Sequence, residues 1–330
     1  MGHREVHFQT SRPHPMITRL RTADDVFLLA FRGPDIGSAK TSVAALGERV
    51  SDIDTPALLE SRRLCGGPGG LGGGVEVSAS FLGRRNFNRY DIEDVVGGAL
   101  GARLGLDYHS RRNGNRPKLS CSGWRLSLNG KQALLMLRIT ERPLHRRMYK
   151  QQTIPGSVHP PLASVMAEIA AIRASDRVLD PCCGAGTLLI EAADRQPDAS
   201  YIGYDLNPTA LRAARSNSVP DMTIERADAG DLPLASNSVD RVLCNPPWDG
   251  QVPARGLLAG GLNRLWVELR RVLEPDGSAV VLLSDTSELA IATSAGFTPT
   301  HLQQVRLSGR HTFIVHLRPR HGSSRGKQGQ

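Results

Sequence analysis

The decapeptide Val178-Leu179-Asp180-Pro181-Cys182-Cys183-Gly184-Ala185-Gly186-Thr187 decides how the rest of this chain is interpreted. Two apolar residues typical of a strand lead into a carboxylate and a proline. Two glycines, one residue apart, then precede an apolar helix at residues 188–193. Glycines allow a sharp turn and bring backbone N–H groups close to a ligand at the start of a helix. The stretch predicts a strand-turn-helix junction with a ligand at the turn; the alternative is an ordinary α/β turn without one.

From Asp176 onward, strand and helix patterns alternate. The expected strands are residues 177–179, 201–204, 222–224, 241–243 and 279–283, and helices are expected to begin near Gly186, Pro208, Leu257 and Ser287. Two further strands, 300–307 and 312–317, flank a hairpin turn at residues 308–311. This order predicts an α/β fold: an open, doubly wound, Rossmann-like sheet with an antiparallel C-terminal hairpin.

Three aspartates, Asp180, Asp205 and Asp228, stand at or just beyond the ends of the first three of these strands. Ligands of such sheets bind beyond the carboxyl ends of the strands. Asp205 could accept hydrogen bonds from both hydroxyls of a ribose, and Asp228 could accept one from a purine amino group. Each such charge-assisted hydrogen bond contributes roughly 1.5–3 kcal/mol. One such aspartate alone would be a turn or cap residue, but three together predict an adenosine-type cofactor pocket. The residues expected to bind the cofactor are Asp180, Cys182, Gly184, Ala185, Gly186, Thr187, Asp205, Leu206, Asp228, Ala229 and Asn245.

A nicotinamide dinucleotide is the first competing cofactor, because dehydrogenases also carry a ribose-binding carboxylate. Their G-x-G-x-x-G fingerprint needs a third glycine, however, and Leu189 stands at that position.

The fourth strand ends in Asn245-Pro246-Pro247-Trp248, which we interpret as the catalytic loop. The prolines fix the backbone and leave the Pro246 carbonyl without a ladder partner. That carbonyl and the Asn245 side-chain oxygen would accept the hydrogens of an amino group on a planar ring, aiming its lone pair at an electrophile. Trp248 would stack on the ring, which must be unpaired or flipped out. The alternative is a rigid Pro-Pro loop with a buried tryptophan.

Positive charge is concentrated at the two ends of the chain. Residues 1–155 carry 24 Lys or Arg against 14 Asp or Glu, residues 156–304 carry 11 against 18, and residues 305–330 carry six against none. Cations that neutralise phosphates release counterions, so a polyanion is the expected partner; the alternative is a soluble protein of high isoelectric point. Aromatic residues lie among the cations of the front half, which suits unpaired RNA. The residues expected to bind RNA are Arg84, Arg85, Arg89, Arg111, Arg112, Arg116, Lys118, Arg146 and Arg147.

The front half predicts an α+β pattern of short elements. Strands are expected at residues 6–10, 17–20, 25–31 and 75–81, around Leu126 and at 133–139, with helices at 41–50, 56–63 and 91–104. The glycine-rich residues 65–74 predict a mobile loop. Residues 151–161 predict a linker, and a helix is expected to begin at Pro161.

The composition excludes several classes of protein. No run of eighteen apolar residues exists and the N-terminus has no apolar signal core, so we expect a cytoplasmic protein without membrane contact. None of the five cysteines forms a C-x-x-C pair, so neither a zinc site nor a disulfide framework is expected.

Two motifs resemble those of a known family. Asp180 to Thr187 and Asn245 to Trp248 look like motifs I and IV of class I S-adenosylmethionine-dependent amino-methyltransferases. Residues 75–149 resemble a THUMP RNA-binding module, and residues 17–25 resemble the ferredoxin-like segment that precedes it. Together these likenesses cover nearly the whole chain, which is similar to the THUMP-containing guanine-N2 RNA methyltransferases. The resemblance implies a partial ferredoxin-like segment (1–64), a THUMP-like RNA-binding domain (65–150) and a class I methyltransferase domain (151–317). The composition of residues 318–330 predicts a disordered basic tail.

The resemblance also implies an activity. S-adenosyl-L-methionine would be the cofactor and the N2 of a guanine in RNA, first of all tRNA, the methyl acceptor, while the THUMP module grips the RNA end. No metal is expected, because the sulfonium already activates the methyl group. The alternatives are an rRNA guanine-N2 methyltransferase, a DNA adenine-N6 or protein glutamine methyltransferase with the same loop, and an RNA-binding protein with an inactive methyltransferase domain. The nucleotide position, the number of methyl groups added and the oligomeric state remain open.

Overall fold

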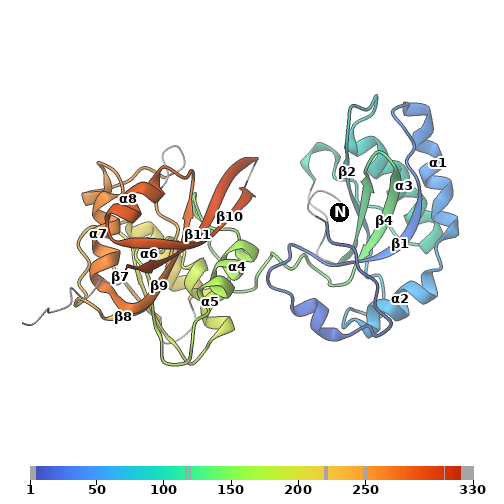
Figure 1. The fold of residues 1–330 in the computed structure, drawn as a ribbon. Helices are drawn as coiled ribbons and strands as arrows, with labels where there is room; N and C mark the ends of the chain where they lie inside the picture. The colour runs from blue at the N-terminus through green and yellow to red at the C-terminus, as the bar shows by residue number, and fades with distance from the viewer. Residues whose placement is uncertain are drawn as a thin grey trace, which may run out of the picture. The chain divides into compact units, whose positions relative to one another are not determined.

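The chain forms two compact units, residues 1–146 and 147–330, each built on its own sheet (Figure 1). The computed structural model describes residues 5–115, 118, 120–218, 222–247, 252–307 and 309–320. The second unit begins four residues before the methyltransferase domain expected from the sequence.

The first unit is a four-stranded sheet in the order β1-β4-β3-β2. Its strands are β1 (Phe27–Pro34), β2 (Gly74–Phe81), β3 (Cys121–Leu128) and β4 (Gln132–Arg138). Only β2 and β3 pair in parallel; the other pairs are antiparallel. Its α-helices are α1 (Ala44–Glu48), α2 (Thr55–Leu64) and α3 (Arg89–Leu104), joined by short 3-10 helices η2 (Lys40–Val43), η3 (Arg49–Asp52) and η4 (Arg112–Gly114). Val77, Ile92 and Trp124 lie in the core shared by the helices and the sheet.

Two expected strands of this unit are wrong. Residues 6–10 have no regular secondary structure, and residues 17–20 lie in and just after a 3-10 helix, η1 (Pro15–Arg19). A proline opens this helix, and the His14 ring accepts a hydrogen bond from the Met16 N–H at 3.1 Å, so the turn is fixed locally. Apolar residues in so short a run do not distinguish a strand from a helical turn.

The glycine-rich loop at residues 65–74 packs against the end of β4. The buried Arg62 side chain donates to the carbonyls of Ile139 at 2.9 Å and Gly70 at 2.6 Å. A Cβ atom at Gly67 would lie 2.2 Å from the Ile139 carbonyl oxygen, so only glycine permits this approach. The loop therefore fastens α2 to the sheet.

The second unit has the sheet order β10-β11-β9-β8-β5-β6-β7. Its strands are β5 (Arg177–Asp180), β6 (Ser200–Tyr204), β7 (Met222–Glu225), β8 (Val239–Cys244), β9 (Leu273–Leu283), β10 (Phe297–Leu307) and β11 (Arg310–Pro319). The strands from β7 to β9 run parallel, and β11 and β10 are antiparallel additions at one edge. The doubly wound sheet with an antiparallel hairpin is as expected from the sequence.

Helices cover both faces of this sheet and create two cores. The helices are α4 (Pro160–Ala170), α5 (Thr187–Arg195), α6 (Pro208–Asn217), α7 (Asn263–Val272) and α8 (Glu288–Ser294), with the 3-10 turn η5 (Gly256–Leu258) before α7. Trp266 and Phe297 lie in one core, and Met166 and Leu189 in the other. The strand order reverses at β5, between β6 and β8, and this switch point is where doubly wound sheets bind ligands.

Three boundaries in this unit differ from expectation. The helix expected near Leu257 begins at Asn263, because Gly256, Gly260 and Gly261 keep the preceding residues as a short 3-10 turn and a loop. The expected linker at residues 151–161 is hydrogen-bonded to this unit up to Val158, and α4 begins at Pro160. Arg318 and Pro319, expected in the tail, belong to β11, while residues 321–330 lie outside the described residues. Within the described ranges, no helix combines the length and apolarity needed to span a membrane.

Candidate cofactor and substrate site

The two sequence motifs meet at one edge of the second sheet. Strands β5 and β8 are parallel neighbours, with Leu179 opposite Val242. Asp180 ends β5 and Asn245 directly follows β8, so both motifs leave the sheet at its carboxyl edge. Cys182 packs against the same apolar core that contains the fully buried Cys244, which brings the two segments side by side. The sheet register therefore places the glycine turn next to the Asn-Pro-Pro loop.

The glycine turn is a backbone feature that other residues would strain. Gly184 has φ +53° and Gly186 has φ +79°, both in the left-handed region, which costs a side-chain-bearing residue roughly 1–2 kcal/mol. A Cβ atom at Gly184 would meet only the Ile154 Cδ1 atom, 3.9 Å away, so the turn is open above this residue. Gly186 forms the N-cap of α5. The turn has the form of a helix-start ligand site.

Asp205 holds this turn from the neighbouring strand. Its Oδ2 atom accepts a hydrogen bond from the Gly184 N–H at 2.9 Å, and its Oδ1 atom accepts one from the Asn207 N–H at 2.8 Å. Each carboxylate oxygen has a second lone pair. Asp205 can therefore support the turn and accept hydrogen bonds from a ligand at the same time.

Asp228 supports a second loop at this edge. Its Oδ1 and Oδ2 atoms accept hydrogen bonds from the N–H groups of Gly230 at 2.8 Å and Leu257 at 2.9 Å. A Cβ atom at Gly256 would lie 2.0 Å from Asp228 Oδ2 and 2.7 Å from Leu206 Cδ1, so the chain passes here only as glycine. Gly256 could not be predicted from the sequence, because a glycine in a loop carries no signal of which side chain it must avoid.

Asp180 is a buried carboxylate beside the turn. It is 1% exposed, and its Oδ1 atom accepts a hydrogen bond from the Cys182 N–H at 3.1 Å. Burial raises the pKa of Asp180 well above its usual range; the Cys182 N–H opposes this and the charge of Asp205 adds to it. A positively charged group bound nearby would favour the ionised form of this carboxylate.

Asn245 presents an unused acceptor. Its Nδ2 atom donates to the Gly156 carbonyl at 3.3 Å, and since a carbonyl only accepts, this bond fixes which end of the amide is the oxygen. The Oδ1 atom is buried and, among the described residues, receives no hydrogen bond. An unsatisfied buried acceptor costs about 1–3 kcal/mol, which a donor arriving at this oxygen would recover. The oxygen has almost no solvent-accessible surface, so a donor reaches it only after neighbouring atoms move.

The remaining predicted site residues lie around these groups. Pro246 is buried and Pro247 half-buried, whereas Trp248 lies outside the described residues. Ala185 and Ala229 are buried, and Cys182 and Leu206 are partly exposed. The Thr187 hydroxyl, at the first position of α5, is buried and has no hydrogen-bond partner in the part of the chain that the structure describes.

Two predicted RNA-binding arginines have structural roles instead. The Arg85 guanidinium makes two hydrogen bonds to Asp35, at 2.7 and 2.8 Å, and both side chains are 5% exposed. Burial alone would raise the pKa of Asp35, but Arg85 and two backbone N–H groups outweigh it and lower the pKa. Arg147 is 8% exposed and donates to the fully buried Glu191 at 2.9 Å. Sequence clusters of arginine do not show which members have buried partners, and the pairing of these two side chains leaves them little exposed surface for a phosphate.

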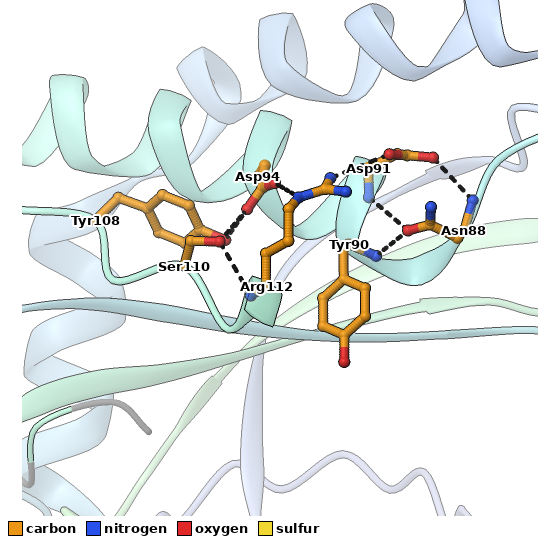
Figure 2. Close-up of polar contacts among 7 residues, drawn as sticks. All are labelled: Asn88, Tyr90, Asp91, Asp94, Tyr108, Ser110 and Arg112. Atoms are coloured by element: carbon orange, nitrogen blue, oxygen red, sulfur yellow. Dashed lines mark hydrogen bonds and ion pairs between the residues drawn. The ribbon is translucent and has the colours of Figure 1, made fainter. Parts of the chain in front are cut away.

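Arg112 is held by a network of side chains on α3 and the following loop (Figure 2). It donates to Asp94 at 2.8 Å and to Asp91 at 3.1 Å. Asp94 also accepts hydrogen bonds from the hydroxyls of Tyr108 at 2.9 Å and Ser110 at 2.7 Å. The Arg112 side chain is still 41% exposed. Its position is therefore fixed while part of it faces solvent.

The other predicted RNA-binding residues are more accessible. Arg89 is exposed, and its guanidinium carbon lies 4.6 Å from the centroid of the Tyr90 ring, which Arg112 approaches to 5.8 Å. Arg84, Lys118 and Arg146 are exposed and Arg111 is half-buried; Arg116 lies outside the described residues.

A cavity of about 500 Å³ lies away from this edge. It is lined by the end of α4 and by residues in the first half of β8 and β9, including Arg241, which is paired with Asp176 at 3.3 Å. No group of three or more His, Cys, Asp or Glu suited to a metal ion occurs in the described segments.

Comparison with known proteins identifies the catalytic unit. Residues 147–313 match the family described as RMKL-like, methyltransferase domain (UPF0020). The tRNA (guanine(6)-N2)-methyltransferase of Thermus thermophilus is 32% identical over 257 residues, covering 74% of this chain and 72% of that protein. The U6 snRNA (guanine-N(2))-methyltransferase THUMPD2 of Mus musculus is 32% identical over 165 residues, 48% of this chain and 30% of that protein.

Solved structures share the fold over most of the chain. The crystal structure of TrmN from Thermus thermophilus superimposes with a TM-score of 0.70 at 27% identity, covering 94% of this chain and 88% of that one. A putative methyltransferase complexed with SAH, SMU.472, gives a TM-score of 0.65 at 15% identity, covering 93% and 88%, and shows likeness of fold alone.

The raised pKa of Asp180 predicts a pH-dependent stability. Above pH ~4, the unfolded chain loses this proton before the folded protein does, so stability falls as pH rises toward the folded pKa. Asp180→Asn cannot ionise and keeps an acceptor for the Cys182 N–H. The variant should gain stability relative to wild type between pH 4 and 7, by about 1.4 kcal/mol for each unit by which the pKa is raised. Urea unfolding at several pH values measures this, and a pH-independent difference would contradict it.

The Arg85–Asp35 pair predicts contrasting effects of two adjacent arginines. Arg85→Ala leaves a buried carboxylate without its cation and should lower the free energy of unfolding by about 3 kcal/mol. Arg84→Ala changes an exposed side chain and should stay within about 0.5 kcal/mol of wild type. Urea denaturation of both variants gives the comparison. Equal stabilities would show that the Arg85 pair does not hold the first unit together.

Proposed function

This chain belongs to the RMKL-like methyltransferase family, and we propose that it transfers the methyl group of S-adenosylmethionine to the exocyclic N2 of a guanine in tRNA. The relatives reported above are named as guanine-N2 methyltransferases of RNA. The single observation that carries the proposal is the buried Asn245 Oδ1 atom beside the glycine turn, which has no hydrogen-bond partner among the residues that the structure describes. An exocyclic amine is a donor of the kind that this acceptor lacks.

The cofactor fits the groups at the carboxyl edge. S-adenosylmethionine supplies an electrophilic methyl group on a positively charged sulfur. The open Gly184 turn and the start of the helix after it would hold the amino-acid portion of the cofactor. Asp205 would accept hydrogen bonds from the ribose hydroxyls. Asp228, Leu206 and Ala229 would contact the adenine. Asp180 would provide negative charge close to the bound cation. The remaining contacts proposed for the cofactor are Cys182, Ala185, Gly186, Thr187 and Asn245.

Asn245 and Pro246 would orient the acceptor amine. The lone pair of a guanine N2 atom is delocalised into the ring, which makes the amine a weak nucleophile. Accepting its two hydrogens on Asn245 Oδ1 and on the Pro246 carbonyl would turn the lone pair out of the ring plane and stabilise the positive charge that grows on nitrogen. Pro247 would keep the loop rigid and Trp248 would stack on the base. These side chains need no metal ion for their part in the reaction.

The first unit would bind the RNA. Its accessible cations can neutralise phosphates, and the guanidinium groups of Arg89 and Arg112 both lie near the Tyr90 ring. We propose that the first unit, which joins residues 65–146 of the expected THUMP-like domain to β1 in one sheet, has this role in a cytoplasmic protein. The cations retained for RNA binding are Arg84, Arg89, Arg111, Arg112, Arg116, Lys118 and Arg146.

The same loop could serve another planar amine. Ribosomal RNA, small nuclear RNA, DNA adenine and a protein glutamine are the competing acceptors. One structural neighbour, a predicted N6-adenine-specific DNA methylase from Listeria monocytogenes, has a TM-score of 0.63 and 17% identity, so it shows likeness of fold alone. The RNA names among the relatives and the basic front half favour tRNA.

Removing the Asn245 amide should reduce methyl transfer without a matching loss of stability. Asn245→Ala should lower kcat by about 10²–10³, the effect of deleting one transition-state hydrogen bond in an enzyme. Asn263→Ala, at an exposed position in α7, is the control and should keep wild-type kcat. The measurement is mass spectrometry of nucleosides from tRNA incubated with each purified protein, with rRNA, snRNA and duplex DNA in parallel. A product other than N2-methylguanosine would refute the substrate, and wild-type kcat in Asn245→Ala would refute the role of the amide.

A further inference from the structure

The chain between the start of the second unit and α4 is fastened at several points to that unit. We call residues 151–158 the 151–158 segment. Just before it, the Arg147 Nε atom and the Tyr149 hydroxyl donate to the same oxygen of Glu191, at 2.9 and 2.8 Å. Glu191 belongs to α5 and is 0% exposed. A buried charge with this many partners holds the chain tightly at its entry to the segment.

Asn217 makes the second attachment. This residue ends α6 and is 3% exposed. Its Oδ1 atom accepts from the N–H groups of Gln151 at 3.0 Å and Gln152 at 2.9 Å, and its Nδ2 atom donates to the carbonyls of Gln152 at 2.9 Å and Ala185 at 3.1 Å. One side-chain amide therefore uses both ends to join the 151–158 segment to the glycine turn. No sequence signal identified this asparagine.

The third attachment reaches the catalytic loop. Ile154 lies closest to the open side of Gly184, and two residues later the Gly156 carbonyl receives the Asn245 amide. Gly156 has φ +78°, and a Cβ atom there would lie 2.5 Å from Val252 Cγ2. Since Val252 follows the Asn-Pro-Pro-Trp motif in the sequence, Gly156 lies against both the first residue of that motif and the chain beyond its end.

We propose that Gly156 and Asn217 are positioning residues: they hold the 151–158 segment between the glycine turn and the catalytic loop, and so fix the Asn245 amide with its oxygen toward the substrate amine. This inference rests on the proposed function and adds residues outside both sequence motifs to its machinery. An asparagine amide whose Nδ2 atom has no partner can rotate about its last side-chain bond, because the preferred angles of that torsion are broad. The Gly156 carbonyl removes this freedom, and Asn217 keeps the carbonyl in place.

The inference requires the segment to be ordered before any substrate binds. In the wild-type protein, the amides of Gln151 and Gln152 should exchange with deuterium much more slowly than in an unfolded chain, because both donate to a buried acceptor. Exchange at the unprotected rate would overturn the inference. This measurement needs no turnover, so it does not depend on which amine the enzyme methylates.

Gly156→Ala tests the positioning directly. The added methyl group meets Val252, so the segment must shift and the Gly156 carbonyl with it. We expect kcat to fall about tenfold, corresponding to ~1.4 kcal/mol, while the Kd for S-adenosylmethionine stays within about twofold. Gly156→Ala combined with Val252→Ala removes the clash and should recover part of kcat. Gly309→Ala is the matched control: Gly309 has φ +86° and open space around its Cα, so it shares the backbone strain without the contact and should keep wild-type kcat.

The outcomes separate this inference from the proposed function. If wild type yields a methylated amine other than N2-methylguanosine, the substrate assignment fails, and the kcat comparison is made on that product instead. The positioning role is overturned if Gly156→Ala and Gly309→Ala have the same kcat. It is also overturned if the fall in kcat of Gly156→Ala comes with an equal rise in the Kd for S-adenosylmethionine. Should Gly156→Ala not fold, Val252→Ala alone loosens the same contact and should lower kcat about two- to threefold with faster exchange at residues 151–157. Wild-type kcat and exchange in that variant would equally overturn the role.

Discussion

The hydrogen bond from the Asn245 amide to the Gly156 carbonyl is the contact on which the interpretation of the site depends. It commits the nitrogen of the amide to the protein and leaves the oxygen buried, with no donor in the described part of the chain. An unsatisfied buried acceptor lowers the stability of the folded protein, and such groups often belong to catalytic or binding sites. The catalytic loop therefore carries its acceptor in place before a substrate arrives, which is the property that electrostatic catalysis requires.

The fold makes this arrangement possible through the order of its strands. Strands β5 and β8 are neighbours in space but about sixty residues apart in sequence, with β6 and β7 on the other side of β5. Their carboxyl ends bring the glycine turn, its supporting Asp205 and the Asn-Pro-Pro loop to one edge. The apolar cores on the two faces keep the strands in register, so the positions of these polar groups follow from packing far from the site.

Sequence patterns identified the second unit well because its signals are local. Alternating strands and helices and the Asp180 and Asn245 motifs each occupy a few consecutive residues, and topology rules join them into one edge. What could not be predicted depends on long-range contacts. Arg85 and Arg147 resemble other arginines in the sequence. Only the fold shows that they form ion pairs of low solvent exposure with Asp35 and Glu191. Residues 151–161 have the composition of a linker, yet a single asparagine 65 residues away from Gln152 holds them to the glycine turn.

The most direct test of the account is a crystal structure of this protein with S-adenosylhomocysteine and a tRNA whose guanine occupies the site. The account predicts that the guanine N2 atom lies within about 3.2 Å of Asn245 Oδ1, with the amide nitrogen still bonded to the Gly156 carbonyl. A guanine bound elsewhere, or an Asn245 oxygen that stays without a donor while the base faces the cofactor, would contradict it.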